Sequence, residues 1–488
     1  MAKKEKPSEA KASKKSKKAK GDDDGEAKFD LASDFNSVLD EVAHKLSDAD
    51  TLDDMAPMST GSLVLDLIEG GGIRPAMYTH FGPEQSAKTT GALLIMASAI
   101  KNNIPIISLR DFEGSTGNSV PYVTSILKTS NVKLTKEQLF GKKDKVTGKW
   151  EVPPRVRYSS NTMGVSFFNW FAAILRRLPD KKMLENEWYL VYDDDKPNQA
   201  KYSSFGVPGM AKKYGKGIYI KAPDEGLQGV IICDSYPNMN PTTKDEDEAD
   251  NSLALQARMF SKNLPRVKGY LASKKVALIG INQLRDVPMA MFGPKEQEPG
   301  GKALRFNSDV RLRWYPRALS AAPLWPRASK KGGYEEEPSV GTEGKDKYKY
   351  IHVKAAKNKL SESDREGFIR LWTKDADGVA HGIDPVFDTM LYLRTTGQLE
   401  GKKRAALRLI WNGDKRGKEM DWQDFKRWIL GDKETMAKMS KKAGAPKPMN
   451  LRAACFKQIA SGKGEELYKD ADNASEKGGK ADDEGEEE

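Results

Sequence analysis

The stretch FGPEQSAKTT, residues 81–90, is the feature of the sequence that most constrains the fold. It matches the phosphate-binding pattern G-x-x-x-x-G-K-[ST] except at Ala87, which stands where the second glycine belongs. Backbone N–H groups of such a loop, and of the helix that follows it, surround nucleotide phosphates. The motif requires a strand before it and a helix after it, so we expect an α/β sheet with a nucleotide at one edge. A turn that resembles the motif by chance is the alternative.

The segments on either side of the loop have the expected character. Residues 77–81 are apolar and predict a strand, and residues 89–100, rich in Ala, Leu and Met, predict a helix. Residues 104–109 predict a second buried strand, and this strand–loop–helix–strand order begins a parallel α/β sheet. Further strands are predicted at 229–233, 276–281, 309–314, 350–356 and 367–372, with long helices at 167–178 and 253–272.

Each part of the loop has an expected role. Lys88 would pair with the β and γ phosphates of a triphosphate, and the Thr89 hydroxyl would ligate Mg²⁺. Ala87 adds a methyl group where glycine permits uncommon dihedral angles, so backbone strain or a shifted phosphate position is expected. The other members of the predicted phosphate cradle are Gly82, Pro83, Glu84, Gln85, Ser86 and Thr90.

Two carboxylates end predicted strands of the same sheet. Asp234 follows the apolar run at 229–233 and would hold the coordination shell of Mg²⁺. Glu113 follows the strand at 104–109 and would orient and deprotonate an attacking water, a role for which Asp111 competes. An acid that caps a strand or lies in a solvated turn is the alternative for each of them.

Composition narrows the class of protein. For 488 residues we expect two or three folded units, and the net charge of +11 favours a polyanionic partner. Cys233 and Cys455 are the only cysteines, so a reducing cytoplasm fits and a disulfide framework does not. No Cys/His cluster has zinc-ligand spacing, no run of about 18 apolar residues predicts a membrane span, and the N-terminus lacks the apolar segment of a secretory signal.

Charge is concentrated at both ends of the chain. The first 20 residues carry nine lysines, whereas the last eight residues, ADDEGEEE, carry six acids. Both ends are predicted to be disordered, either as solubilising tails or as a basic arm and an acidic tail that competes with DNA for the protein's own basic surface. The expected organisation begins with a basic tail at 1–28 and an N-terminal segment at 29–57 that holds one amphipathic helix at 29–50. A core at 58–376 follows, with inserts at about 129–156 and 180–227. The chain ends in a small basic helical domain at 377–460 and an acidic tail at 461–488.

Taken in order, these motifs resemble those of the RecA family of DNA strand-exchange recombinases, over most of residues 58–400. The resemblance implies an α/β fold: a RecA-type P-loop ATPase core with a mostly parallel twisted sheet, an N-terminal oligomerisation helix and a small C-terminal domain. The matching segments are STGS at 59–62 with Asp66, GPEQSAKTT at 82–90, DFE at 111–113, IICDS at 231–235, INQLR at 281–285, KNK at 357–359 and, most specific of all, MFGPKEQEPGGKALRFNSDVRLR at 291–313.

The resemblance also implies roles for single residues at the nucleotide. Lys88, Thr89 and Asp234 fall on the family's phosphate and Mg²⁺ positions, and Glu113 falls on its general base. Tyr122 is similar to a tyrosine that stacks on adenine, with packing of its own helix as the alternative.

Three further residues would connect the nucleotide to other partners. Gln283 matches a glutamine that senses the γ-phosphate and links it to DNA binding. Lys357 and Lys359 match a pair that reaches the ATP of the neighbouring subunit, which would tie hydrolysis to filament assembly. Ordinary surface lysines near a strand end are the alternative for this pair.

Two segments would contact single-stranded DNA. In the first, 244–259, Leu253 and Arg258 fall on DNA-contacting positions of the family, although the acids at 245–248 are unusual beside DNA. The second, 286–301, combines apolar, glycine and basic residues, which fits a single-strand groove, and a flexible surface loop is the alternative. The contacts expected in and around it come from Arg285, Met289, Met291, Phe292, Gly300, Gly301, Lys302, Arg305 and Arg311.

Several features depart from the family pattern. Ala87 is expected to slow hydrolysis or to change nucleotide preference, and Pro288 replaces an aliphatic residue that the family uses at a gap between bases. The inserts lengthen the connection from Glu113 to Asp234. These differences indicate a divergent lineage, with a viral origin as one option, in the cytoplasm of a bacterium or of a bacteriophage-infected cell.

The expected function is that of a DNA-dependent ATPase and recombinase, with ATP and Mg²⁺ as cofactors. It would form helical homo-oligomeric filaments on single-stranded DNA and exchange strands with double-stranded DNA, with single-strand-binding or loader proteins as further partners and no membrane contact. Basic residues within 402–416 would gather the duplex. The alternatives are an ATP-responsive DNA-coating filament with little hydrolysis, a hexameric helicase-type motor, and a regulatory P-loop ATPase that binds no DNA.

Overall fold

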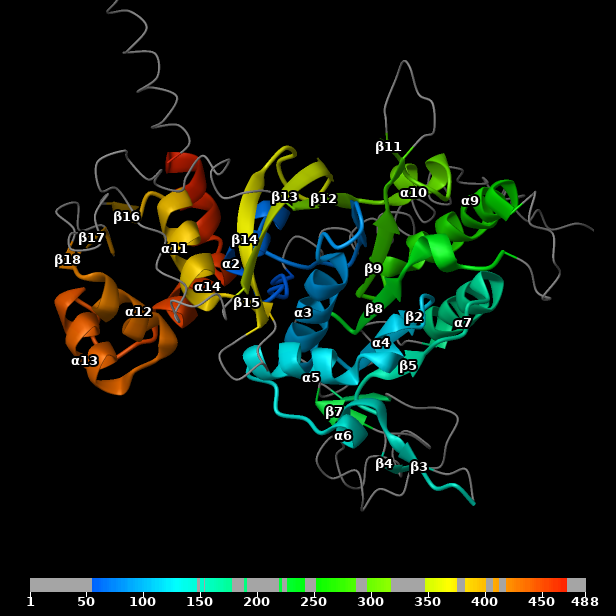
Figure 1. The fold of residues 1–488 in the computed structure, drawn as a ribbon, viewed down its shortest axis with the longest axis horizontal. Coiled ribbons are helices and arrows are strands. Elements are labelled where there is room, and N and C mark those ends of the chain that lie inside the picture. Colours follow the sequence, from blue (N-terminus) through cyan, green and yellow to red (C-terminus); the bar gives the residue numbers. More distant parts are fainter. Residues whose placement is uncertain are drawn as a thin grey trace, which may run out of the picture. The chain divides into compact units, whose positions relative to one another are not determined.

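The structure is a computed structural model (Figure 1). It describes residues 55–146, 150–152, 154–177, 188–190, 219–221, 226–241, 252–286, 296–316, 347–374, 382–400, 407–411 and 418–471. The tail at 1–28, the helix predicted at 29–50 and most of the insert at 180–227 lie outside these residues. None of the helices in the described ranges combines the length and the apolar character needed to cross a membrane.

A nine-stranded sheet organises the core, in the order β15-β14-β13-β12-β1-β9-β8-β2-β5. Neighbouring strands from β12 to β5 pair in parallel, and the pairs from β12 to β15 are antiparallel. The mostly parallel sheet predicted from the sequence is therefore confirmed. The strands are β1 (Met77–Gly82), β2 (Ile106–Asp111), β5 (Arg157–Ser159), β8 (Gly229–Asp234), β9 (Val276–Gln283), β12 (Val310–Pro316), β13 (Lys347–Asn358), β14 (Glu366–Lys374) and β15 (Gly382–Ile383).

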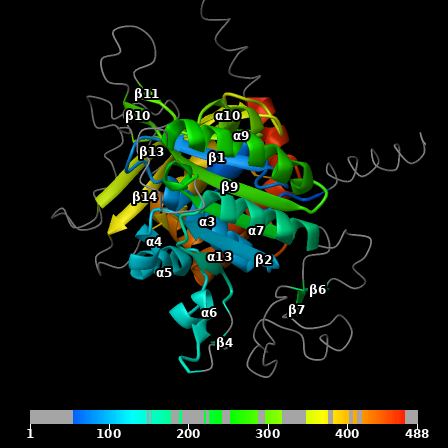
Figure 2. The ribbon, with the colours of Figure 1, turned by 90° about the vertical axis from the view of Figure 1, so that its right-hand side faces the viewer.

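Helices cover both faces of this sheet. On β8, Val230 and Ile232 pack into one hydrophobic cluster, whereas Ile231 and Cys233 pack into a second. Because side chains alternate along a strand, the two clusters lie on opposite faces. Figure 1 shows β8 and β9 with helices on both sides, and Figure 2 shows the sheet from one of these sides. The first cluster includes α2 (Leu63–Glu69), α3 (Lys88–Lys101) and α5 (Val120–Thr129), and the second includes α7 (Gly164–Arg177), α9 (Ser252–Leu271) and α10 (Lys302–Asn307).

The described part of the insert at 129–156 has regular structure of its own. Its helix begins at Thr135, whose hydroxyl accepts from the backbone of Gln138, and the Gln138 side chain accepts from the backbone of Thr135 in return. This reciprocal capping box satisfies two backbone donors, and Leu139 is buried. The elements of this insert are α6 (Lys136–Phe140), β3 (Lys142–Lys143) and β4 (Trp150–Val152), and β3 pairs with β4. Before the insert, the short helix α4 (Ser115–Asn118) precedes α5. Within the second insert, β6 (Trp188–Leu190) pairs with β7 (Tyr219–Lys221).

The C-terminal region shares the core of the sheet. Strand β15 pairs with β14, and Phe387, Leu391 and Trp428 belong to the hydrophobic cluster that also holds α2 and α3. The boundary predicted at 377 therefore marks a change of composition and not a break in packing. The elements are α11 (Pro385–Thr395), α12 (Trp422–Leu430), α13 (Lys433–Lys442), α14 (Leu451–Ala460) and a small sheet of β16 (Leu399–Glu400), β17 (Leu407–Leu409) and β18 (Lys418–Met420).

The beginning of the predicted acidic tail is folded. Residues 463–471 are helical, and Glu465 pairs with the guanidinium of Arg365, which is buried at the end of the β13–β14 turn. Arg365 also donates to the Leu67 backbone carbonyl at 3.1 Å. The prediction of disorder from residue 461 is wrong for this stretch, where Glu465 joins Glu362 as a carboxylate partner of the buried Arg365.

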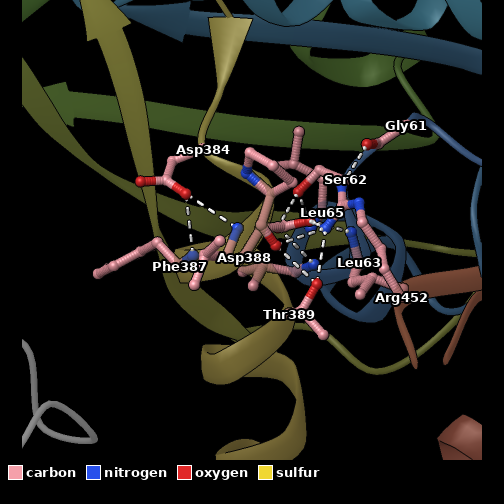
Figure 3. Close-up of polar contacts among 12 residues, drawn as sticks. Gly61, Ser62, Leu63, Leu65, Asp384, Phe387, Asp388, Thr389 and Arg452 are labelled. Carbon is pink, nitrogen blue, oxygen red and sulfur yellow. Dashed lines mark hydrogen bonds and ion pairs between the residues drawn. The ribbon is translucent and has the colours of Figure 1, made fainter. Parts of the chain in front are cut away.

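A buried carboxylate joins the C-terminal region to the start of the core (Figure 3). Asp388 on α11 accepts from the Ser62 hydroxyl at 2.6 Å and from the backbone N–H groups of Leu63 and Val64 at 2.9 and 3.2 Å. It thereby caps the N-terminus of α2, whose first N–H groups have no partner within the helix. Arg452 on α14 pairs with Asp388 at 2.6 Å and donates to the Gly61 carbonyl at 3.0 Å, so one ion pair joins α2, α11 and α14.

Replacing this carboxylate should destabilise the whole fold. Asp388→Ala removes the cap of α2 and leaves the half-buried Arg452 without its anion, so we expect the free energy of unfolding to fall by roughly 3–5 kcal/mol. Chemical denaturation monitored by circular dichroism measures this, with Glu434→Ala, an exposed acid on α13, as the control that should change little. A loss for Asp388→Ala no larger than that of the control would contradict the role.

Candidate nucleotide site

The carboxyl ends of four parallel strands meet at the phosphate loop. The register pairs Gly82 on β1 with Gln283 on β9, and Asp111 on β2 with Asp234 on β8. Because parallel neighbours end at the same edge of the sheet, residues distant in the sequence are brought side by side. This is the edge at which open parallel α/β sheets bind ligands.

The loop holds two residues in an unusual backbone conformation. Gln85 and Ala87 have φ angles of 56° and 66°, in the left-handed region that favours glycine. The prediction of strain at Ala87 is therefore confirmed at the level of geometry. Lys88, the first residue of α3, donates to the carbonyls of Gly82 and Pro83 at 3.0 and 2.5 Å. Burial lowers the pKa of Lys88 to about 8, with Asp234 and Glu113 opposing the shift.

The residues predicted for Mg²⁺ lie in contact. The Thr89 hydroxyl donates to Oδ2 of Asp234 at 2.8 Å, whereas Oδ1 of Asp234 is buried without a hydrogen-bond partner among the described residues. Burial, and then repulsion from Glu113, raises the pKa of Asp234 to about 7. A buried carboxylate oxygen without a donor, beside a hydroxyl and a phosphate loop, fits a hard cation such as Mg²⁺ that is ligated by oxygen.

Glu113 is held by two donors, one that directly follows β8 and one at the end of β9. Its Oε1 accepts from the Ser235 hydroxyl at 2.6 Å and from Nε2 of Gln283 at 2.7 Å. Asp111, the competing acid, is buried and accepts from the backbone N–H groups of Thr116 and Gly117 at 2.8 and 3.1 Å. Asp111 therefore caps the turn into α4, and Glu113, which is exposed, is the carboxylate that faces the site.

These side chains line one cavity of about 560 Å³. Its walls include Tyr122, whose hydroxyl lies 2.5 Å from that of Thr90 and which also packs against the core. Its stacking on adenine stays a prediction. Three residues in the cavity wall lie outside every motif matched in the sequence: Lys349 on β13, and Leu371 and Trp372 on β14. The antiparallel edge of the sheet brings them there, and no motif marks them.

The lysine pair predicted to act on a neighbouring subunit lies away from this cavity. Lys357 is on β13, eight residues beyond Lys349, which corresponds to about 27 Å along an antiparallel strand. It donates to the carbonyls of Arg305 and Phe306 at the end of α10, at 2.9 and 3.3 Å. Lys359 follows the end of β13 and is exposed. Neither lysine lines the cavity of its own chain.

The structure describes only part of the two predicted DNA segments. Residues 252–259 form the first turns of α9, with Arg258 exposed, so this half of the first segment is helical and not a loop. Leu253 lies on the same turns, and nothing is described of its side chain. In the second segment Met289, Met291 and Phe292 lie outside the described residues, between β10 (Arg285–Asp286) and β11 (Glu296–Gln297).

The cations around the second segment fall into two groups. Arg311 pairs with the buried Glu298, and Arg305 lies 3.4 Å from the same carboxylate. Arg285 and Lys302 are exposed. Gly300 and Gly301 have φ angles of 87° and 72° and turn the chain into α10. Two of the predicted DNA-binding arginines, Arg305 and Arg311, are thus held by an acid, Glu298.

Comparison with known proteins finds similarity to one family over part of the chain. Residues 221–318 match the family model described as the RecA N-terminal domain. Protein RecA of Thermus aquaticus is 31% identical over 211 residues, which are 40% of this chain and 55% of that protein.

Protein RecA of Thermus thermophilus is 32% identical over 176 residues (36% of this chain, 44% of that protein), and Protein RecA of Macrococcus caseolyticus is 35% identical over 123 residues (22% and 35%). The chain thus spans about half or less of the length of these relatives. The chain is thus similar to RecA proteins over part of its length.

The left-handed backbone at Ala87 gives a test of the loop geometry. We expect Ala87→Gly to raise the free energy of unfolding by about 0.5–1 kcal/mol. Glycine adopts the positive φ of residue 87 without strain, and this gain exceeds the conformational entropy that glycine adds to the unfolded chain. The matched control is Ala92→Gly inside α3, which should lower it by about 1 kcal/mol or more. If both variants lose stability equally, as measured by urea denaturation, Ala87 is not strained.

Proposed function

We propose that this protein is an ATP-dependent DNA recombinase that polymerises on single-stranded DNA and exchanges strands with a homologous duplex. The observation that carries the proposal is the 2.7 Å hydrogen bond from Gln283 to Glu113. It joins the carboxylate expected to activate water to the last residue of β9, from which the predicted DNA segment departs. The nucleotide site and the DNA segment would therefore respond to one another.

Binding of ATP would use the loop as a cradle. The phosphates would lie at the N-terminus of α3, where backbone N–H groups and the helix dipole favour negative charge. Lys88 would exchange the carbonyls of Gly82 and Pro83 for phosphate oxygens, and its pKa of about 8 keeps it charged at neutral pH. Mg²⁺ bound with the nucleotide would neutralise phosphate charge, held by Thr89 and Asp234.

Hydrolysis would use Glu113 as the base. Ser235 and Gln283 both donate to Oε1, which fixes the carboxylate and leaves Oε2 to accept a proton from water. A γ-phosphate that drew Gln283 toward itself would also change the hydrogen bonding of Glu113. Through Gln283 the same event would change the start of the DNA segment, which is how ATP would control the grip on the strand.

Filament assembly would complete the nucleotide site from a second protomer. Lys357 and Lys359 lie too far along β13 to reach the cavity of their own chain, which supports a role toward the ATP of a neighbour. DNA would lie along the exposed cations Arg285 and Lys302, with the sequence-independent, salt-sensitive binding that phosphate contacts give. An ATP-responsive coating filament with little hydrolysis and a hexameric motor are the competing functions, which the experiments below separate.

Removing the base should abolish turnover and keep binding. We expect Glu113→Gln to retain ATP but to lower DNA-stimulated hydrolysis by about 10²–10⁴-fold. Phosphate release and binding of a fluorescent ATP analogue measure the two effects, and Glu137→Gln, an exposed acid on α6, is the control. If wild-type protein polymerises with ATP but does not hydrolyse it, the result would favour the DNA-coating filament with little hydrolysis.

Strand exchange distinguishes a recombinase from a motor. Wild type should exchange a labelled strand with ATP and should also pair it with a non-hydrolysable analogue, because the bound nucleotide would hold the active state. Electron microscopy with single-stranded DNA should show helical filaments. Closed rings, or unwinding that requires hydrolysis, would support the hexameric motor instead.

The trans role of Lys357 predicts complementation between two inactive variants. Lys357→Ala should lose ATP hydrolysis in the filament because the neighbouring site lacks its trans lysine. Lys88→Ala should lose it because its own loop lacks the phosphate-binding lysine. A mixture should regain part of the ATPase activity, because an interface can combine an intact loop from one protomer with Lys357 from the next. Lys354→Ala, on the same strand with its ammonium 3.3 Å from Asp364, is the control. A mixture as inactive as its components would rule out the trans arrangement.

A further inference from the structure

Among the described residues that line the cavity, Lys349 is the one cation that the phosphate-loop motif does not contain. It lies near the start of β13, is half-buried, and reaches across to the loop, where its ammonium donates to the backbone carbonyl of Gln85. It also lines the cavity together with Lys88 and Thr89. Burial lowers the pKa of Lys349, and its charge contributes to the lowered pKa of Lys88.

The residue that Lys349 contacts, Gln85, is one of the two residues of the phosphate loop that have a left-handed backbone conformation. Gln85 has a φ angle of 56° and Ala87 one of 66°, while the Ser86 between them is buried. L-residues seldom adopt this conformation without support from their surroundings. The Ser86 hydroxyl donates to the Pro83 carbonyl at 2.8 Å within the loop, whereas Lys349 is a contact from outside it.

The carbonyl of Gln85 and the N–H of Ser86 belong to the same peptide unit. A cationic donor on the carbonyl polarises that unit and makes its N–H a stronger donor to an anion. It also holds the plane of this peptide, and with it the ψ angle of Gln85 and the φ angle of Ser86, between the two left-handed residues of the loop. One lysine can therefore stabilise the strained loop and prepare its N–H groups for phosphate.

We propose that Lys349 is a positioning residue of the nucleotide site, which holds the 85–87 segment in the conformation that glycine would adopt unaided. The proposal rests on the function proposed above, since it takes the loop to bind the phosphates of ATP. Lys349 acts through the Gln85 carbonyl and not by transfer of a proton or by contact with the reacting atoms. The chain thereby replaces a glycine inside the loop with a lysine on a distant strand.

Loss of this contact should weaken nucleotide binding in proportion to the strain it offsets. We expect Lys349→Met to raise the Kd for a fluorescent ATP analogue by about 10-fold or more, as for a lost hydrogen bond to a charged group. Lys349→Arg should restore most of the affinity. Lys354→Met, on the same strand but paired with Asp364 away from the cavity, should bind as wild type does. Circular dichroism melts check that each variant is folded.

A double-mutant cycle distinguishes loop support from simple attraction to phosphate. In a background of Gln85→Gly and Ala87→Gly the left-handed conformation no longer needs support, so Lys349→Met should raise Kd by about threefold or less. An equal effect in both backgrounds would overturn the proposal, because the lysine would then act on the nucleotide directly. An unchanged Kd for Lys349→Met in the original background would overturn it as well.

The outcome for wild type distinguishes this inference from the proposed function. If wild-type protein binds no ATP analogue, the proposed function fails and the role of Lys349 fails with it. If wild type binds and hydrolyses ATP while the cycle shows no coupling between Lys349 and the loop, only the inference fails.

Discussion

The parallel pairing of β1, β2, β8 and β9 is the constraint on which the site depends. Each strand ends in a residue of the candidate nucleotide site or directly before one. The register places Gly82 beside Gln283 and Asp111 beside Asp234. A shift of one residue in any of these pairs would move the strand's side chains to the opposite face and separate the carboxylates from the loop. Burial on both faces of the sheet makes such a shift costly, so the hydrophobic core also sets the geometry of the nucleotide site.

The second organising interaction lies at the other end of the core. Asp388 caps α2 and pairs with Arg452, so three elements from the start and the end of the described chain are fixed to one carboxylate. Nearby, the Asp66 side chain accepts from Ser59 and Thr60, and burial raises the pKa of Asp66 to about 7. Buried charges joined in this way cannot separate without exposing unpaired groups. The C-terminal helices are therefore part of the core rather than an appended module.

The sequence predicted the strands around the candidate nucleotide site better than it predicted the limits of the fold. The strand positions followed from apolar runs. Lys88 and Thr89 followed from the loop motif, Asp234 and Glu113 from their places after apolar strands, and Gln283 from the family resemblance. Lys349 and Trp372 could not be predicted, because an antiparallel strand returning to the sheet leaves no spacing signal for the cavity it will meet. The boundaries at 377 and 461 failed for a related reason. Composition reports where charge accumulates, whereas packing depends on single residues such as Glu465, which the charge of the tail conceals.

A comparison of Gly82 and Gly91 with position 87 explains why the second glycine of the loop motif can be replaced by alanine. A Cβ at Gly82 would lie 2.0 Å from the Trp314 carbonyl oxygen, and one at Gly91 would lie 2.3 Å from the Trp314 ring, so these positions require glycine for space. At residue 87 the requirement is conformational, since the methyl group of alanine is accommodated and only the positive φ is unfavourable. A conformational cost of this kind can be offset by a contact that holds the loop in place, as we propose for the contact of Lys349 with the Gln85 carbonyl, two residues before Ala87. A steric clash with a buried tryptophan has no such remedy, because the tightly packed core would have to move.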